Sequence, residues 1–226
     1  MRYEYFVKCV IVGDPGVGKS CLAGSICNEE HMVEHFPTIG IDFKTLQHNR
    51  KNGDAVKLHI WDAAGEKSFR SIVETYCACV GAAIVVFDIT NKDSFQAIDG
   101  WIETILRVRG EKEGGSVLPI LIIGNKSDLS NRRVIKKEEA KQFASERGGM
   151  YMEVSARGGI NVDDLRDMIY AVTIDKNRNA PIVESNVSSM RKDGYVRMVG
   201  SPKTSKVKII SWLKKLFFKF LGFSCF

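Results

Sequence analysis

The chain has 226 residues, which is enough for one domain with an appended segment but short of two full domains. Its composition, 44% hydrophobic and 27% charged with five prolines, excludes collagen-like, mucin-like and wholly disordered proteins. The net charge of +6 belongs to the tail, because residues 194–226 hold seven Lys and Arg and no Asp or Glu; this disfavours a basic domain that binds nucleic acid and favours contact of the C-terminus with an anionic surface.

Short apolar runs alternate with helical patterns over the first 175 residues, as expected of a parallel sheet with crossover helices. Asn52-Gly53 is a hairpin signal between the second and third runs, so one strand pair is expected to be antiparallel, with the second strand at an edge. The predicted fold class is therefore α/β, with a six-stranded, mostly parallel sheet and helices on both faces. Its strands are expected at residues 6–12, 43–48, 56–61, 82–88, 118–123 and 150–154.

Helical periodicity appears between these runs. Helices are expected over residues 20–27 and 136–148, and two more are expected where Asp93 caps one apolar pattern and Asn161 with Asp164 opens another. The apolar faces of the last two hold Phe95, Ile98, Ile102, Ile105 and Leu106, and Leu165, Met168 and Val172, respectively.

The periodicity stops near residue 176. The expected organisation is a folded domain over 1–175, a flexible linker over 176–206 and a tail over 207–226. Four polar residues, Lys208, Ser211, Lys215 and Lys219, form a narrow stripe opposite a broad apolar face. No uncharged stretch is long enough to cross a bilayer, so the tail is expected to lie in the interface of an anionic membrane, the alternative being a helix that docks on the domain or on a partner.

A phosphate-binding pattern follows the first strand. Residues 13–20, Gly-Asp-Pro-Gly-Val-Gly-Lys-Ser, fit G-x-x-x-x-G-K-[ST] in the strand-loop-helix context that this motif requires. Glycines let successive backbone N–H groups point inward at phosphate oxygens, and the helix adds the positive end of its dipole. Lys19 is expected near the β- and γ-phosphates, and the Ser20 hydroxyl on Mg²⁺.

The base signal is Asn125-Lys126-Ser127-Asp128. The Asp128 carboxylate can accept from both the ring N–H and the amine of guanine, whereas adenine opposes it with an acceptor, at a cost of about 1–3 kcal/mol. After the last strand, Ser155-Ala156-Arg157 offers a backbone amide to the guanine carbonyl. The sequence thus favours guanine and argues against a kinase or ATPase with the same phosphate loop.

Two residues between these motifs complete a metal site. Asp62 ends an apolar strand, a position from which a carboxylate reaches Mg²⁺ through water. Thr38 lies in a loop, where a second hydroxyl on the metal would let the γ-phosphate decide whether that loop is ordered. The predicted metal-binding residues are therefore Ser20, Thr38 and Asp62.

With these motifs in order, residues 6–175 resemble the Ras superfamily of small GTPases. Residues 38–43 (TIGIDF) and 68–72 (SFRSI) are most similar to the Rab branch. The resemblance implies a three-layer P-loop GTPase fold, a first switch at 31–43 and a second at 62–77. It also implies that effectors bind an aromatic triad of Phe43, Trp61 and Tyr76, although core packing is an alternative role for these rings.

Three residues depart from the family pattern. Glu66 stands where the family usually has the glutamine that orients the attacking water; a carboxylate can accept from that water but brings negative charge towards the γ-phosphate, and an ordinary solvated loop residue is the alternative. Pro15 has no N–H, so the amide cradle must begin at Gly16. His31 stands where an aromatic ring commonly packs over the base, and it either stacks there or is a surface histidine.

The function expected from the residues and the resemblance is a Rab-like GTP/GDP switch in vesicle traffic, which binds GTP and Mg²⁺ and hydrolyses GTP slowly without an activating protein. The alternative is a nucleotide-dependent binding module with impaired hydrolysis. The expected catalytic residues are Lys19, Thr38, Gly65 and Glu66. The expected GTP-binding residues are Asp14, Gly16, Val17, Gly18, Lys19, Ser20, Cys21, His31, Thr38, Gly65, Asn125, Lys126, Asp128, Ser155, Ala156 and Arg157.

Partners and location follow from the same reasoning. An activating protein, an exchange factor and effectors are expected, with no nucleic acid. The six cysteines form no C-x-x-C pair and nothing resembles a signal peptide, which predicts a cytoplasmic protein, peripheral on the cytosolic face of an intracellular membrane. Cys225 fits neither a C-a-a-X box nor a double-cysteine ending, so its prenylation is not predicted, whereas acylation stays open.

Overall fold

The computed structural model describes residues 5–29, 38–49, 53, 55–66, 69–77, 80–109 and 118–174. The linker and tail expected at 176–226, with Cys225, lie outside these ranges, as do His31 and Asn52. None of the helices within the described ranges has both the length and the apolar character needed to span a bilayer.

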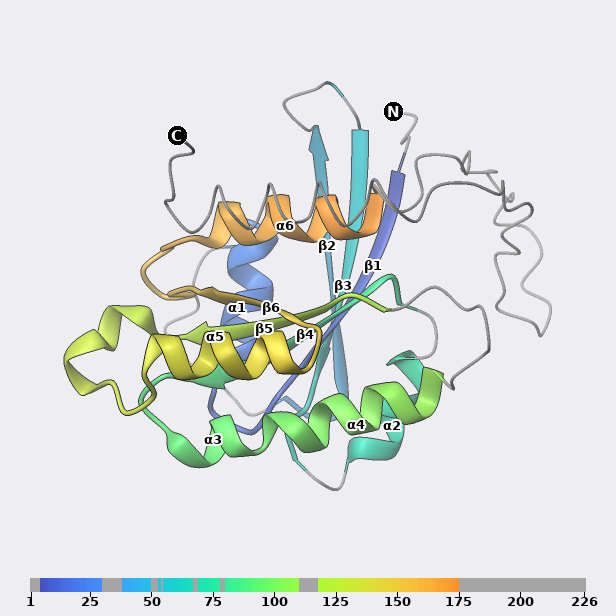
Figure 1. The fold of residues 1–226 in the computed structure, drawn as a ribbon. Coiled ribbons are helices and arrows are strands. Elements are labelled where there is room, and N and C mark those ends of the chain that lie inside the picture. Colours follow the sequence, from blue (N-terminus) through green and yellow to red (C-terminus); the bar gives the residue numbers. More distant parts are fainter. Residues whose placement is uncertain are drawn as a thin grey trace, which may run out of the picture. The chain divides into compact units, whose positions relative to one another are not determined.

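The fold is built on a six-stranded sheet in the order β2-β3-β1-β4-β5-β6 (Figure 1). Only the β2–β3 pair is antiparallel. Every residue of β4 and β5 is buried, because helices cover both faces of these central strands. The predicted fold class and the edge position of the second strand are confirmed. The strands are β1 (Tyr5–Val12), β2 (Ile41–Asn49), β3 (Ala55–Ala63), β4 (Ala82–Asp88), β5 (Ile120–Asn125) and β6 (Met150–Glu153).

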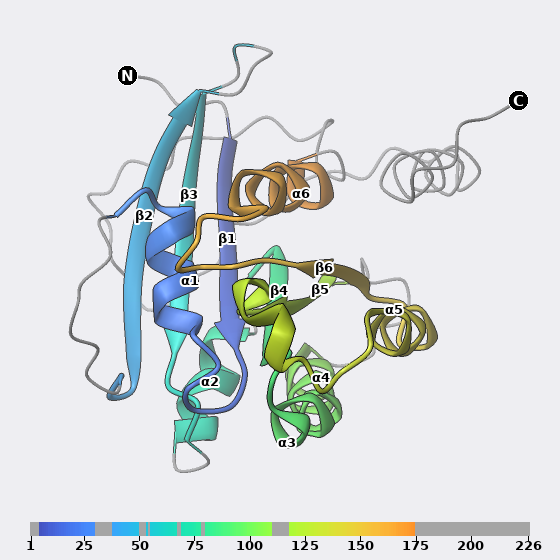
Figure 2. The ribbon, with the colours of Figure 1, turned by 90° about the vertical axis from the view of Figure 1, so that its left-hand side faces the viewer.

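Two hydrophobic cores lie on opposite faces of the sheet. The first is formed with α1 and α6, and the second with α2, α3, α4 and α5 (Figure 2). The described helices are α1 (Lys19–Ile26), α2 (Arg70–Cys77), α3 (Lys92–Gln96), α4 (Ile98–Arg109), α5 (Lys137–Glu146) and α6 (Val162–Ile174), and a 3₁₀ helix covers Ser127–Arg132. Leu165, Met168 and Val172 of α6 are buried, as their periodicity predicts.

Two details of the helix predicted at Asp93 are wrong. The cap is Asn91, whose extended backbone lets its Oδ1 accept from the N–H groups of Asp93 and Ser94 at 2.9 and 3.2 Å. The pattern is also split, since α3 ends at Gln96 and α4 starts at Ile98. Within α4, Ile98, Ile102 and Ile105 are buried, whereas Leu106, which was expected on the same face, is 49% exposed.

The strand directions decide where the functional loops meet. Because β1, β3, β4, β5 and β6 are mutually parallel, their carboxyl ends share one edge of the sheet. The phosphate loop follows β1, Asp62 lies near the end of β3, and Asn125 is the last residue of β5. Motifs separated by more than one hundred residues therefore converge on one place.

Candidate nucleotide-binding site

The loop after β1 needs glycine at two positions for different reasons. Gly13 has a φ of +145°, and a Cβ there would lie 2.2 Å from the Val86 carbonyl oxygen. Gly18 has a φ of +91°, and its Cβ would lie 2.5 Å from Asn125 Nδ2. Both positions combine a left-handed backbone with close neighbours, so only glycine fits them.

Lys19 is held inside this loop. Its side chain is 94% buried, and Nζ donates to the Asp14 carbonyl at 2.9 Å. Burial lowers the pKa of Lys19 to about 8, while the charges of Asp62 and Asp14 act in the opposite direction. A bound phosphate would add negative charge beside this ammonium and favour its protonated form.

Gly65 lies directly against the phosphate loop. A Cβ at this position would come within 2.6 Å of Lys19 Nζ and of the Gly13 carbonyl oxygen. The loop after β3 thus reaches the lysine that is expected at the terminal phosphates. Glu66, the next residue, is exposed, and its carbonyl accepts from the Phe69 N–H at 3.1 Å.

Three oxygen-bearing side chains suit a magnesium ion. Ser20 Oγ and Thr38 Oγ1 are 2.8 Å apart, close to the separation of about 3 Å between adjacent ligands of an octahedron with Mg–O bonds of about 2.1 Å. Asp62 is fully buried, and neither carboxylate oxygen has a hydrogen-bond partner among the described residues. Burial raises the pKa of Asp62, while the Ser20 hydroxyl and the Lys19 ammonium act in the opposite direction. The donor set fits Mg²⁺.

The base-recognition segments face each other. Asp128 is exposed, and its Oδ1 accepts from the Ser155 hydroxyl at 2.5 Å. The two segments are also joined through the backbone, since the Ser127 N–H donates to the Val154 carbonyl at 3.0 Å. Two reciprocal backbone hydrogen bonds between Ser155 and Ile160 close the loop that carries Ala156 and Arg157.

Asn125 ties these segments to the phosphate loop. Its side chain is almost fully buried; Nδ2 donates to the Val17 carbonyl at 2.9 Å, and Oδ1 accepts from the Ala156 N–H at 3.0 Å. Lys126 adds a second link, because Nζ donates to the Gly16 carbonyl at 2.8 Å and pairs with Asp88 at 2.7 Å. The sequence predicted that both residues bind the nucleotide but missed that they join the loops.

The other predicted residues occupy the same region or lie outside the described ranges. Asp14 Oδ1 accepts from Trp101 Nε1 of α4 at 2.9 Å, a contact that no sequence motif signals. Cys21 is half-buried, and its pKa is raised by burial, with Arg157, Asp128 and Lys126 close enough to act on it. It therefore lies on the base side of the site, whereas His31 falls in the segment that the structure does not describe.

A sequence comparison decides the family. The Ras family model matches residues 8–174, which is more than half of the chain. The chain belongs to the Ras family. It is thus a small GTPase, a protein that binds guanine nucleotide, typically with Mg²⁺, and acts as a switch between nucleotide states. The Ser20–Thr38 pair and the orphaned Asp62 carboxylate agree with that assignment.

The three rings predicted as an effector surface are in contact. The ring centroids of Phe43 and Trp61 are 5.0 Å apart, and those of Trp61 and Tyr76 are 4.4 Å apart. Phe43 is exposed, whereas Trp61 and Tyr76 are half-buried. The rings therefore combine mutual packing with accessible area.

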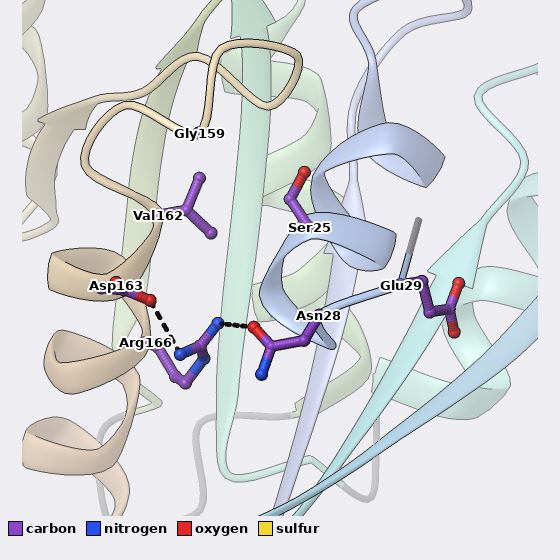
Figure 3. Close-up of a pocket in the computed structure, with 7 residues that line it drawn as sticks. All are labelled: Ser25, Asn28, Glu29, Gly159, Val162, Asp163 and Arg166. Atoms are coloured by element: carbon purple, nitrogen blue, oxygen red, sulfur yellow. Dashed lines mark hydrogen bonds and ion pairs between the residues drawn. The ribbon is translucent and has the colours of Figure 1, made fainter. Parts of the chain in front are cut away.

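A cavity of about 320 Å³ lies between α1 and α6, behind the loop that carries Ala156 (Figure 3). The buried Arg166 guanidinium forms one wall and donates to the Ile26 carbonyl, Asp163 Oδ1 and Asn28 Oδ1, at 2.7 to 3.0 Å. Ser25 Oγ donates to the Ala156 carbonyl at 2.7 Å. These bonds fix the end of α1 to the base-recognition side of the GTPase, and the sequence motifs do not predict them.

We expect Asn125→Ala to accelerate nucleotide release. The substitution leaves the Val17 carbonyl and the Ala156 N–H without their partner, so the two loops lose their link, and the dissociation rate should rise about tenfold or more. Displacement of a fluorescent GDP by excess unlabelled GDP measures this rate. Asn131→Ala, at an exposed asparagine, serves as control. An unchanged release rate in the Asn125 variant would contradict the tethering role.

Asp62→Asn should uncouple nucleotide binding from magnesium. In the wild type, chelation of Mg²⁺ with EDTA should weaken GDP affinity. Without the metal, the buried Asp62 carboxylate lacks the divalent cation that offsets its charge. In the variant, affinity should respond little to EDTA, and thermal stability without metal should be equal or higher, since a buried unpaired charge is gone. Calorimetry with and without Mg²⁺ measures the affinities. Asp93→Asn, at an exposed acid, should retain the wild-type dependence on Mg²⁺.

Proposed function

We propose that this GTPase is a Rab-like switch in vesicle and membrane traffic that hydrolyses GTP slowly until an activating protein supplies an arginine. The contact between Ser20 and Thr38 carries the proposal, because it brings a residue of the expected first switch to the metal position. The Rab-like runs at 38–43 and 68–72 and the contiguous triad of Phe43, Trp61 and Tyr76 support the choice of branch.

The residues of the site divide the work. Lys19 and the loop amides from Gly16 onward hold the phosphates, because Pro15 has no N–H to donate. Ser20 and Thr38 bind the metal, with Asp62 behind them; Mg²⁺ when bound neutralises phosphate charge. Gly65 offers its amide to the terminal phosphate, and Glu66 orients the attacking water. Asp128 selects guanine, and Ser155 holds its carboxylate in place.

A membrane role rests on residues outside the described ranges. The basic and apolar tail at 207–226 would hold the protein on the cytosolic face of an intracellular membrane, where each basic residue near an anionic leaflet contributes about 1 kcal/mol. Flotation with anionic liposomes should recover the full chain and lose the chain truncated after residue 206. Equal recovery of both would contradict membrane binding by the tail.

Base selection tests the nucleotide part of the proposal. Calorimetry in Mg²⁺ should show binding of GDP and GTP and little binding of ADP and ATP. Asp128→Ala should reduce that discrimination, because the carboxylate that pairs with guanine is removed. Asp164→Ala, at an exposed acid of α6, keeps the selectivity. If neither guanine nucleotide binds, the switch proposal fails.

A second candidate function is a nucleotide-dependent binding module that barely hydrolyses GTP. It is favoured by the exposed carboxylate of Glu66 beside Gly65, since a negative charge at the γ-phosphate opposes water attack. Single-turnover phosphate release from GTP-loaded protein separates the two. If hydrolysis is impaired by this charge, Glu66→Gln should raise the rate. A wild-type rate that Glu66→Gln lowers would instead make Glu66 the water-positioning group.

A further inference from the structure

The effector triad is part of a longer row of rings on the sheet. His59 joins Phe6 to Phe43, with ring centroids 4.3 and 4.7 Å apart, and the contacts continue through Trp61 to Tyr76. We call these five residues the aromatic row. It crosses from β1 through β3 and β2 to α2, so it links the fixed sheet to the expected second switch.

Two of the five rings, Phe6 and Phe43, are exposed on a part of the sheet that no described helix covers. On β1, Val10 is fully buried beneath the helices of the second core, whereas Phe6, four residues earlier on the same face, is 43% exposed. Phe43 on β2 is 44% exposed. The opposite face of the same strands is closed, since Val7 and Leu58 are buried in the first core. Two large exposed rings joined through His59 indicate an interaction surface.

Two lysines give this surface its charge. Lys8 Nζ lies 5.4 Å from the centroid of Phe6, and Lys57 shares the face with His59 two residues along β3. In the described strands β1, β2 and β3, no Asp or Glu faces this side, because Asp42 and Asp62 have the opposite strand parity. Within the described residues, neither Lys8 nor Lys57 forms an ion pair, so both ammonium groups can pair with an anionic group of a partner.

The pKa of His59 depends on the charge of these two lysines. Burial, followed by the charges of Lys57 and Lys8, lowers its pKa to about 4. The ring is therefore neutral near pH 7 and packs as an aromatic surface between the two phenylalanines. A carboxylate bound beside the lysines would offset their effect and raise the pKa of His59.

We propose that Phe6, Lys8, Phe43, Lys57 and His59 form a docking site for a polypeptide partner that presents carboxylates next to apolar side chains. The carboxylates pair with the two lysines, and the apolar groups cover the exposed rings. Phe6 and Lys8, and likewise Lys57 and His59, occupy alternate positions of a strand and are therefore about 6.8 Å apart along it. An extended peptide has the same repeat, so its alternate side chains can contact a ring and a lysine in turn. The proposal names the partner chemistry of the switch proposed above and rests on it.

The test uses the full chain loaded with a non-hydrolysable GTP analogue and a random peptide library displayed on phage. Selected peptides should be enriched in Asp and Glu beside aromatic or aliphatic residues. Their affinity should fall about tenfold or more for the double variant Lys8→Glu, Lys57→Glu. It should stay unchanged for Lys92→Glu, Lys136→Glu, which makes the same charge change at exposed positions on other elements. In NMR titrations, the pKa of His59 should rise when a selected peptide binds.

Three outcomes overturn the proposal: selected peptides without acidic enrichment, equal affinity for wild type and Lys8→Glu, Lys57→Glu, or, in place of acidic peptides, binding to anionic phosphatidylserine vesicles that Lys8→Glu, Lys57→Glu abolishes. A variant that fails to fold is recognised by its lost GDP binding, and Lys8→Met, Lys57→Met then gives the same comparison with less perturbation. Acidic peptides that bind the GDP and GTP forms equally would support the docking site and contradict the switch.

Discussion

The carboxamide of Asn125 joins two loops that the sequence separates by more than one hundred residues. One end of the amide holds the Val17 carbonyl and the other holds the Ala156 N–H, so the phosphate loop and the base loops are set at a fixed distance. Because the group is almost fully buried, these bonds are poorly accessible to competing water. Lys19, Asp128 and Ser155 each lie on a segment that this amide anchors, and the bond from Lys126 Nζ to the Gly16 carbonyl reinforces the connection.

The sheet was predictable, but some helix details were not. Continuous apolar runs predicted β4 and β5 because strands covered on both faces are apolar up to their carboxyl ends, where Asp88 and Asn125 lie. The cap at Asn91 was missed because Asp93 is an equally good capping residue, and only the local backbone distinguishes them. The helix at Arg70–Cys77 was not predicted either, since it packs against β1 and α4 through tertiary contacts.

The candidate site shows the same division between local and distant information. The phosphate loop, Asp62 and Asp128 could be predicted from the sequence because each motif is a short run whose chemistry is readable from adjacent residues. The roles of Asn125 as a tether, of Asp14 as an acceptor for Trp101 and of Arg166 behind the base loop were not found. Each depends on a partner that only the folded chain brings near. The joining of Phe6 and Phe43 by His59 is likewise a product of strand pairing.

The position of Arg166 in the chain affects the order in which the domain can fold during synthesis on the ribosome. The carbonyl of Ile26, at the end of the first helix, is satisfied by a guanidinium 140 residues later in the chain. The first helix therefore emerges long before the side chain that completes its terminus. The native end of this helix can therefore form only after nearly the whole domain has left the exit tunnel, which makes the last helix a late requirement for folding of the first.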